Sequence, residues 1–180
     1  MFYTSIDLET SGLDPQRHGI VSIGAITTQA DGRKVEQFYS LCNPFGPASK
    51  LEMDPQAMEI NGLKPSEIAN APNMLVTLRD LMFHWTEFNP TLVFCNAPFD
   101  VAFLLAAIRR EQRLAPLYEK YYRRVLDLYG LQFMHCGKVL SLSEMCKAWG
   151  VKNEKAHNAL ADARVTSQIF HKLLQEKAVA

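Results

Sequence analysis

The sequence predicts an α/β fold in which a five-stranded mixed sheet is flanked by helices. Three strand-like runs joined by short turns open the chain, which is typical of an antiparallel meander. Further along, segments with helical periodicity alternate with short apolar runs, as in parallel β-α units. Because the first run has neighbours both early and late in the chain, we expect it to be a central strand of a layered α/β domain.

The N-terminal strands follow from alternation and turn chemistry. Residues 2–9 form the first predicted strand, and residues 10–15 contain the Gly and Pro of a loop. Residues 20–28 are rich in β-branched side chains, which favour a second strand. Asp31-Gly32 is a strong hairpin signal, and the alternation of residues 34–43 predicts a third strand after it.

The remaining chain reads as helices separated by short strands. Asp54 precedes a proline and Asp127 precedes an apolar segment, so both are expected to cap helices. The apolar spacing predicts helices at residues 54–60, 65–68, 73–88, 99–113, 128–135, 140–149 and 158–176, and strands at residues 91–95 and 121–126.

Composition limits the possible functions. A chain of 180 residues fits one domain, and 19 basic residues balance 19 acidic ones. This balance argues against a protein that coats long nucleic acid by neutralising phosphates, but it permits an enzyme that grips a few nucleotides at a chain end. The arginines at 109, 110, 113, 123 and 124 are expected on solvated surfaces.

The cysteines and the hydrophobic pattern indicate a cellular setting. Four cysteines are scattered without CxxC spacing, which disfavours zinc. No signal peptide and no apolar run long enough to cross a bilayer is found. We therefore expect a cytoplasmic protein with reduced thiols and no membrane partner.

Two carboxylates stand out in the first strand. Side chains alternate between the faces of a strand, so Asp7 and Glu9 share one face while Ile6 and Leu8 share the other. Neighbouring carboxylates repel each other unless a cation lies between them, and oxygen ligands favour Mg²⁺ or Mn²⁺. The alternative is an acidic pair on the solvent face of an edge strand.

A third carboxylate follows the apolar strand at residues 91–95. Asp100 is expected near the start of the next helix, at the end of a strand, where sites assemble in α/β sheets. The alternative is that Asp100 only complements the positive end of its helix. The neighbouring Phe99 is either a core residue or a ring that contacts a base.

The segment at residues 156–162 supplies an imidazole and a fourth carboxylate. Asn158 can cap the last helix, which places His157 just outside it and Asp162 about one turn inside. A mobile histidine beside fixed carboxylates suits a general base, because its pKa lies near working pH. The alternative is a surface histidine, which is also what we expect of the four others: His18, His84, His135 and His171.

Three motifs resemble those of the DEDDh 3′→5′ exonucleases, the DnaQ-like family. They are Asp7-x-Glu9-Thr10, Asn96-x-Pro98-Phe99-Asp100 and His157-Asn158-Ala159-Leu160-x-Asp162-Ala163, and they come in the family's order over nearly the whole chain. Asn61 and Cys95 stand where histidines are frequent in the family, but neither is a catalytic position. The resemblance implies a ribonuclease H-like fold and a single exonuclease domain at residues 1–180.

The resemblance also implies a two-metal phosphodiester hydrolysis. Asp7 would bridge both ions, Glu9 and Asp162 would complete one metal site, and Asp100 would hold the second ion. His157 would take the proton from the attacking water. The expected cofactors are two Mg²⁺ ions, which Mn²⁺ can replace.

The expected substrates are the 3′ ends of single-stranded nucleic acid, with DNA favoured over RNA and nucleoside 5′-monophosphates as products. Candidate contacts to the terminal nucleotides are Thr10, Leu13, Ile60 (or its neighbour Met58), Asn96 and Phe99. Apolar side chains can pack on any base, so these contacts imply no sequence preference.

Three other roles remain open at this stage. The chain could be a proofreading subunit that acts with a polymerase, or a homodimeric enzyme that trims RNA or short oligonucleotides, to which residues 121–127 bear a loose resemblance. The third possibility is a non-catalytic nucleic-acid-binding module. The presence of all four carboxylates and of the histidine argues against the module.

Overall fold

We analysed a computed structural model of the chain, which describes residues 1–47, 49–111, 114, 116 and 123–177. The following predictions lie outside the described residues: the first part of the strand at 121–126, the last turn of the helix at 99–113, the surface position of Arg113, and the tail at 178–180.

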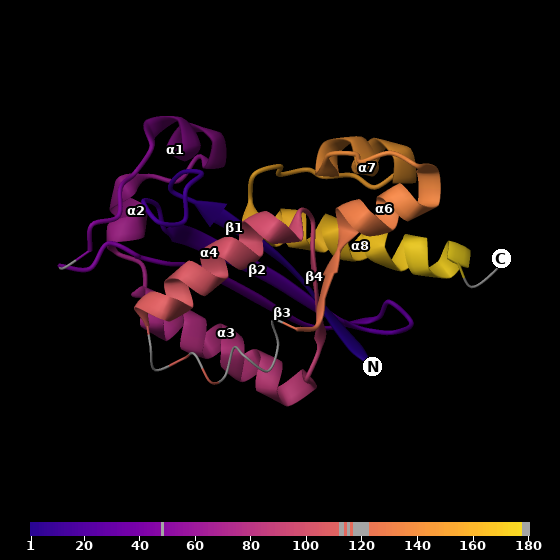
Figure 1. Ribbon diagram of the computed structural model, residues 1–180, viewed down its shortest axis with the longest axis horizontal. Coiled ribbons are helices and arrows are strands. Elements are labelled where there is room, and N and C mark those ends of the chain that lie inside the picture. Colours follow the sequence, from indigo (N-terminus) through magenta and orange to yellow (C-terminus); the bar gives the residue numbers. More distant parts are fainter. Residues whose placement is uncertain (48, 112–113, 115, 117–122, 178–180) are drawn as a thin grey trace.

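A five-stranded mixed sheet forms the centre of the molecule (Figure 1), as the sequence predicts. The strand order is β3-β2-β1-β4-β5, so β1 is central. It runs antiparallel to β2 and parallel to β4, and β5 is parallel to β4. The strands are β1 (Phe2–Thr10), β2 (Ile20–Gln29), β3 (Lys34–Leu41), β4 (Thr91–Phe94) and β5 (Val125–Asp127).

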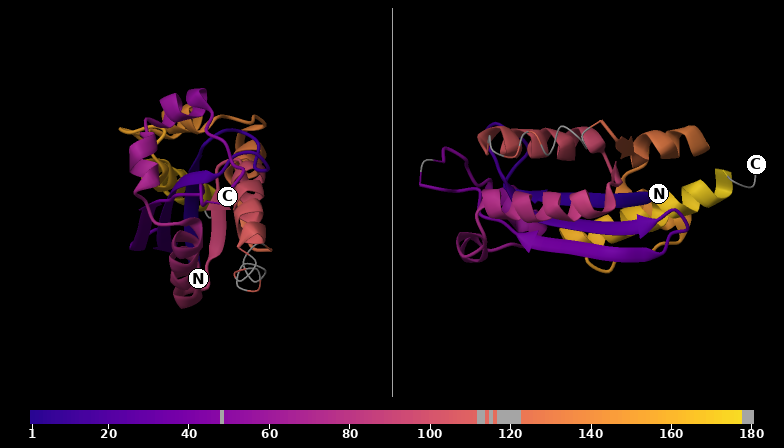
Figure 2. Two further views of the ribbon diagram at one scale, coloured as in Figure 1. Left: turned by 90° about the vertical axis from the view of Figure 1, so that its left-hand side faces the viewer. Right: turned by 90° about the horizontal axis from the view of Figure 1, so that it is seen from below.

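Helices cover both faces of this sheet (Figure 2). Ile6 and Leu8 pack with buried residues of α3 and α4, whereas α8 lies on the opposite face and packs with α6 and α7 around Val93. Asp7 and Glu9 therefore face α8, not open solvent. The helices are α1 (Pro55–Asn61), α2 (Pro65–Ala69), α3 (Met74–Phe88), α4 (Ala97–Arg110), α6 (Leu128–Cys136), α7 (Leu142–Trp149) and α8 (Ala159–Lys177).

The helix that follows β4 begins earlier than predicted. We expected its start at Phe99, but α4 begins at Ala97 because proline is tolerated in the first turn, where its missing N–H would have no partner. Asp100 consequently lies in the first turn of α4 and is 4% exposed. The predicted capping roles of Asp54 and Asp127 are confirmed, because their side chains accept the N–H groups of Gln56 and Tyr129.

A glycine allows the last helix to approach the sheet closely. Gly24 pairs with Asp7 across β2 and β1. A Cβ atom at Gly24 would lie 2.2 Å from the carbonyl carbon of Ala159 and 2.3 Å from the nitrogen of Leu160. Only glycine therefore fits at this contact, which places the first turn of α8 directly over the acidic face of β1.

The prediction that the remaining histidines lie on the surface is wrong for two of them. His18 and His171 are each 8% exposed. The Nε2 atom of His171 lies 2.8 Å from Thr28 Oγ1, and His18 packs beneath Gly12. A buried histidine is tolerated where a hydrogen-bond partner meets its ring, and the sequence alone does not reveal such distant partners.

Within the described residues, the helices are too short or too polar for any of them to span a membrane.

Candidate active site

Three carboxylates meet where β1 passes the first turn of α8. One oxygen from each of Asp7, Glu9 and Asp162 lies within 4.8 Å of the others. The β alternation places the first two on the same face, and the close approach at Gly24 brings Asp162 over them. The predicted convergence of these three side chains is thus observed.

Asp100 joins this cluster from α4. The backbone N–H groups of Leu8 and of Asp100 itself donate to its carboxylate, so this carboxylate lies against β1. Asp100 is also close enough to Asp7 to repel its negative charge. The alternative role, in which Asp100 only complements its helix terminus, does not account for these contacts.

Burial and mutual repulsion raise the pKa values of the clustered carboxylates. The pKa of Asp7 lies well above its ordinary range, through burial first and then through Asp100, Glu9 and Asp162. Burial, followed by the charge of Asp162, raises the pKa of Glu9 from 4.5 to about 7. Burial also raises the pKa values of Asp100 and Asp162, although hydrogen bonds to both carboxylates oppose the shift. The site thus holds more negative charge than its surroundings compensate.

Asp162 is held by the loop that joins α7 to α8. The backbone N–H of His157 donates to Asp162 Oδ2 at 2.9 Å, and Asn153 Nδ2 donates to Asp162 Oδ1. Asn158 caps α8 as predicted, since its side chain accepts the N–H of Ala161 at 3.1 Å. Asp162 is therefore fixed by two donors from outside its own helix.

His157 lies beside the cluster with an exposed side chain. Its backbone adopts the left-handed conformation, with φ of 63°. The backbone N–H of His157 makes the hydrogen bond to Asp162, and the exposed imidazole lies within electrostatic range of the same carboxylate.

The loop after β1 lies beside the carboxylates. Thr10 is 8% exposed, and its Oγ1 donates to the carbonyl of Gly12 at 2.7 Å. Arg110 of α4 donates to the carbonyl of Pro15 at 2.6 Å, which anchors the loop from outside. Leu13, between these two anchors, is 79% exposed.

Helix α1 is attached to the same loop. Asn61 Nδ2 donates to the carbonyl of Thr10 at 3.3 Å, and the backbone N–H of Asp54 donates to the carbonyl of Ser11 at 2.7 Å. Ile60, which precedes Asn61, is 53% exposed. The exposed apolar side chains of Leu13 and Ile60 are thus carried by segments that bond to each other.

The other two predicted substrate contacts lie at the start of α4. Asn96 has a left-handed backbone, and its N–H donates to Asp127 Oδ1 at 3.2 Å. Phe99 is half-buried, with its ring centroid 4.9 Å from that of Phe103. Phe99 therefore packs against the core and is still partly exposed.

Two residues in this region were not singled out as functional from the sequence. Asn153 has no distinctive spacing, and only the fold shows that it holds Asp162. Asp127 was expected to cap α6, but it also holds the end of β4 through Asn96 and adds negative charge near Asp100. In the sequence, the only signal for this second role of Asp127 was the position of its carboxylate at the end of a strand.

The donor set of the cluster suits divalent cations. Its ligands are carboxylate oxygens, which hard ions such as Mg²⁺ and Mn²⁺ prefer, and among the described residues no buried basic side chain is found to act on Asp7. The raised pKa values show that a bound cation would relieve the repulsion. Asp7, Glu9, Asp100 and Asp162 therefore fit a divalent metal centre.

The chain is similar in sequence to two kinds of DNA polymerase III protein. The subunit epsilon of DNA polymerase III from Rickettsia typhi is 28% identical over 168 residues, covering 92% of this chain and 70% of that protein. A PolC-type DNA polymerase III from Thermotoga petrophila is 30% identical over 173 residues. That match covers 96% of this chain but only 12% of the polymerase.

The fold is similar to that of solved exonuclease structures. E. coli exonuclease I in complex with a dT13 oligonucleotide superimposes with a TM-score of 0.81 at 20% identity, over 98% of this chain and 42% of the other. This likeness confirms the predicted ribonuclease H-like fold.

A family model for exonucleases, RNase_T, matches residues 4–170. Together with the epsilon relatives, this match confirms the resemblance that the three motifs suggested. The chain therefore belongs to the DEDD-type 3′→5′ exonuclease family and is an exonuclease of that class.

Proposed function

We propose that residues 1–180 act as one exonuclease domain that removes nucleotides from the 3′ end of single-stranded nucleic acid, preferably DNA, and releases nucleoside 5′-monophosphates. The observation that carries this proposal is the convergence of Asp7, Glu9 and Asp162, with Asp100 against the same strand and His157 beside them.

The proposed metal ligands follow from the resemblance to the family, and the convergence of Asp7, Glu9 and Asp162 supports them. Asp7 would hold both of two Mg²⁺ ions, Glu9 and Asp162 one of them, and Asp100 the other, with Mn²⁺ as a substitute. When bound, the ions would neutralise the carboxylates, polarise the scissile phosphate and lower the pKa of water. The protein's own contribution is to fix these four side chains on β1, α4 and α8 before the substrate arrives.

His157 is the proposed general base. It would accept the proton of the attacking water on a ring nitrogen, and its exposed side chain allows it to approach a phosphate at the carboxylates. Asn153 and the His157 N–H keep the loop attached to Asp162, so that the imidazole starts from a defined position.

The terminal nucleotides would lie between the loop after β1 and the start of α4. Leu13 and Ile60 present exposed apolar side chains, and Phe99 is partly exposed, so these three would pack against the end bases. Thr10 and Asn96 are the polar candidates for sugar or phosphate contacts.

The relatives suggest a setting for this activity. Those named above are a PolC-type DNA polymerase III and a subunit epsilon of DNA polymerase III, and the exonuclease I structure holds a dT13 oligonucleotide. We infer that this chain works in the cytoplasm on DNA ends, together with a polymerase. The homodimeric RNA-trimming role is the alternative, and comparing DNA and RNA oligonucleotides of identical sequence distinguishes the two.

The test is a degradation assay with a 5′-labelled single strand. We expect a ladder that shortens stepwise in Mg²⁺ or Mn²⁺, stops in EDTA, and yields nucleoside 5′-monophosphates. Asp7→Asn should abolish turnover while circular dichroism remains native. Cleavage that persists in EDTA, or that starts inside the strand, would contradict the proposal.

A further inference from the structure

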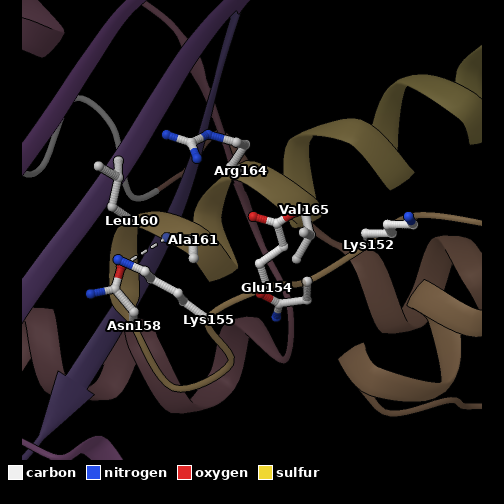
Figure 3. Close-up of a pocket in the computed structure, with 9 residues that line it drawn as sticks. Lys152, Glu154, Lys155, Asn158, Leu160, Ala161, Arg164 and Val165 are labelled. Carbon is white, nitrogen blue, oxygen red and sulfur yellow. Dashed lines mark hydrogen bonds between the residues drawn. The ribbon is translucent and has the colours of Figure 1, made fainter.

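A cavity of about 410 Å³ lies behind the carboxylate cluster, between the α7–α8 loop and the first turns of α8 (Figure 3). Its lining includes Lys152, Glu154 and Lys155 from the loop, and Asn158 and Arg164 from the helix start and its first turns. None of the roles assigned above uses these charged side chains.

The charges around this cavity are mostly positive. Lys152, Lys155 and Arg164 face one acidic residue, Glu154. Within the described part of the chain, none of these three cations takes part in an ion pair. In Figure 3, Lys155 extends toward Asn158 and Arg164 stands over the cavity, whereas the amino group of Lys152 is directed away. Lys155 and Arg164 are therefore the cations best placed to bind an anion.

The start of α8 adds to this positive potential. The helix has 19 residues, and the end capped by Asn158 borders the cavity. Aligned peptide dipoles place partial positive charge at such an end. The helix end and the two basic side chains thus favour the same class of ligand, an anion with several oxygen atoms.

One residue, Asn153, borders both the cavity and the carboxylate cluster. Asn153 lines the cavity and also donates to Asp162. The cavity therefore adjoins the carboxylate cluster through this one side chain. A chain without net charge has no general attraction for a polyanion, so local cations must supply it.

We propose that this cavity binds a phosphodiester group of the nucleic-acid strand that is being degraded, at a nucleotide away from the cleaved end. Lys155 and Arg164 would contact the phosphate oxygens directly. This inference rests on the proposed function, since it assumes that the strand reaches the carboxylates. The cavity would add a phosphate contact that longer strands make and dinucleotides do not. Longer strands would therefore bind more tightly than dinucleotides.

The experiment compares the wild type with the double variant Lys155→Ala/Arg164→Ala. Binding of a labelled oligonucleotide with a phosphorothioate at its last linkage is measured in Mg²⁺ over a range of salt concentrations. Loss of two phosphate contacts should reduce the slope of log K against log salt by about 1.4, which is about 25-fold in affinity at about 0.1 M salt. Lys172→Ala, an exposed lysine further along α8, is the matched control and should bind as the wild type does.

A kinetic measurement separates this proposal from the proposed function. The ratio of kcat/KM for the oligonucleotide to that for a dinucleotide should fall about tenfold in the double variant, and further in Lys155→Glu. Unchanged affinity and salt slope, or an equal loss on both substrates, would overturn the cavity proposal. A wild type that hydrolyses neither substrate would overturn the proposed function, while the binding measurement would still report on the cavity.

Discussion

Replacing Glu9 by glutamine should stabilise the metal-free protein while weakening its binding of metal ions. The pKa of Glu9 is raised from 4.5 to about 7, through burial first and then through the charge of Asp162. Glutamine keeps the shape of the side chain but carries no charge. The variant therefore removes an unfavourable charge from the folded state.

The size of this effect follows from the raised pKa. The difference between 4.5 and about 7 corresponds to about 3.5 kcal/mol, at about 1.4 kcal/mol for each pH unit. Glu9 is partly exposed, so solvent screening reduces the expected gain to about 2 kcal/mol. Between these two pKa values the folded state binds more protons than the unfolded state, and the stability of the metal-free wild type falls as pH rises.

Urea denaturation in EDTA measures the effect. The advantage of Glu9→Gln should be full at about pH 8 and absent at about pH 4, where both proteins are neutral at this position. Glu59→Gln, at an exposed glutamate of α1, is the matched control and should change little. Added Mg²⁺ should stabilise the wild type more than Glu9→Gln, because the variant keeps only Asp7, Asp100 and Asp162 of the four proposed ligands. Equal stability of the wild type and Glu9→Gln at about pH 8 would refute the claim that burial and the charge of Asp162 destabilise the ionised form of Glu9.

Three further predictions address the positions that fix the site. Gly24→Ala should lower the free energy of unfolding by about 1–3 kcal/mol and reduce turnover, because the new Cβ collides with Ala159; unchanged urea midpoints would contradict this. Asn153→Ala should weaken Mg²⁺ binding measured by calorimetry about tenfold, because Asp162 loses a donor, whereas native affinity would exclude a positioning role. Burial lowers the pKa of His171, so its neutral form contributes stability that is present above pH 6.5, the ordinary value, and is lost as pH falls through the lower folded pKa. His171→Gln should flatten that part of the stability profile measured by urea denaturation, and an equally steep profile would assign it to other groups.

The local patterns of the sequence predicted much of this fold. Alternation in residues 2–9 correctly placed Asp7 and Glu9 on one face, because a strand has a strict two-residue period. Capping chemistry correctly located the starts of α1, α6 and α8, since Asp54, Asp127 and Asn158 each bond to a nearby backbone N–H. These signals span only a few residues, which is why they can be read without a structure.

Contacts between distant segments could not be predicted in this way. The close approach of Gly24 to Ala159 joins residues far apart in the chain, and no local sequence pattern predicts this contact. The bond from Asn153 to Asp162 depends on the path of a loop, and the burial of His171 depends on a partner in β2. The order of the motifs in the sequence predicted that the carboxylates converge. It did not predict which residues hold those carboxylates in place.

The most direct test of the metal-site proposal is a calorimetric titration of the metal-free protein with Mn²⁺. We predict two bound ions for each chain, and their loss in Asp7→Asn, because Asp7 would hold both. A wild type that binds no Mn²⁺, or an Asp7→Asn variant that binds two ions with native affinity, would contradict the account.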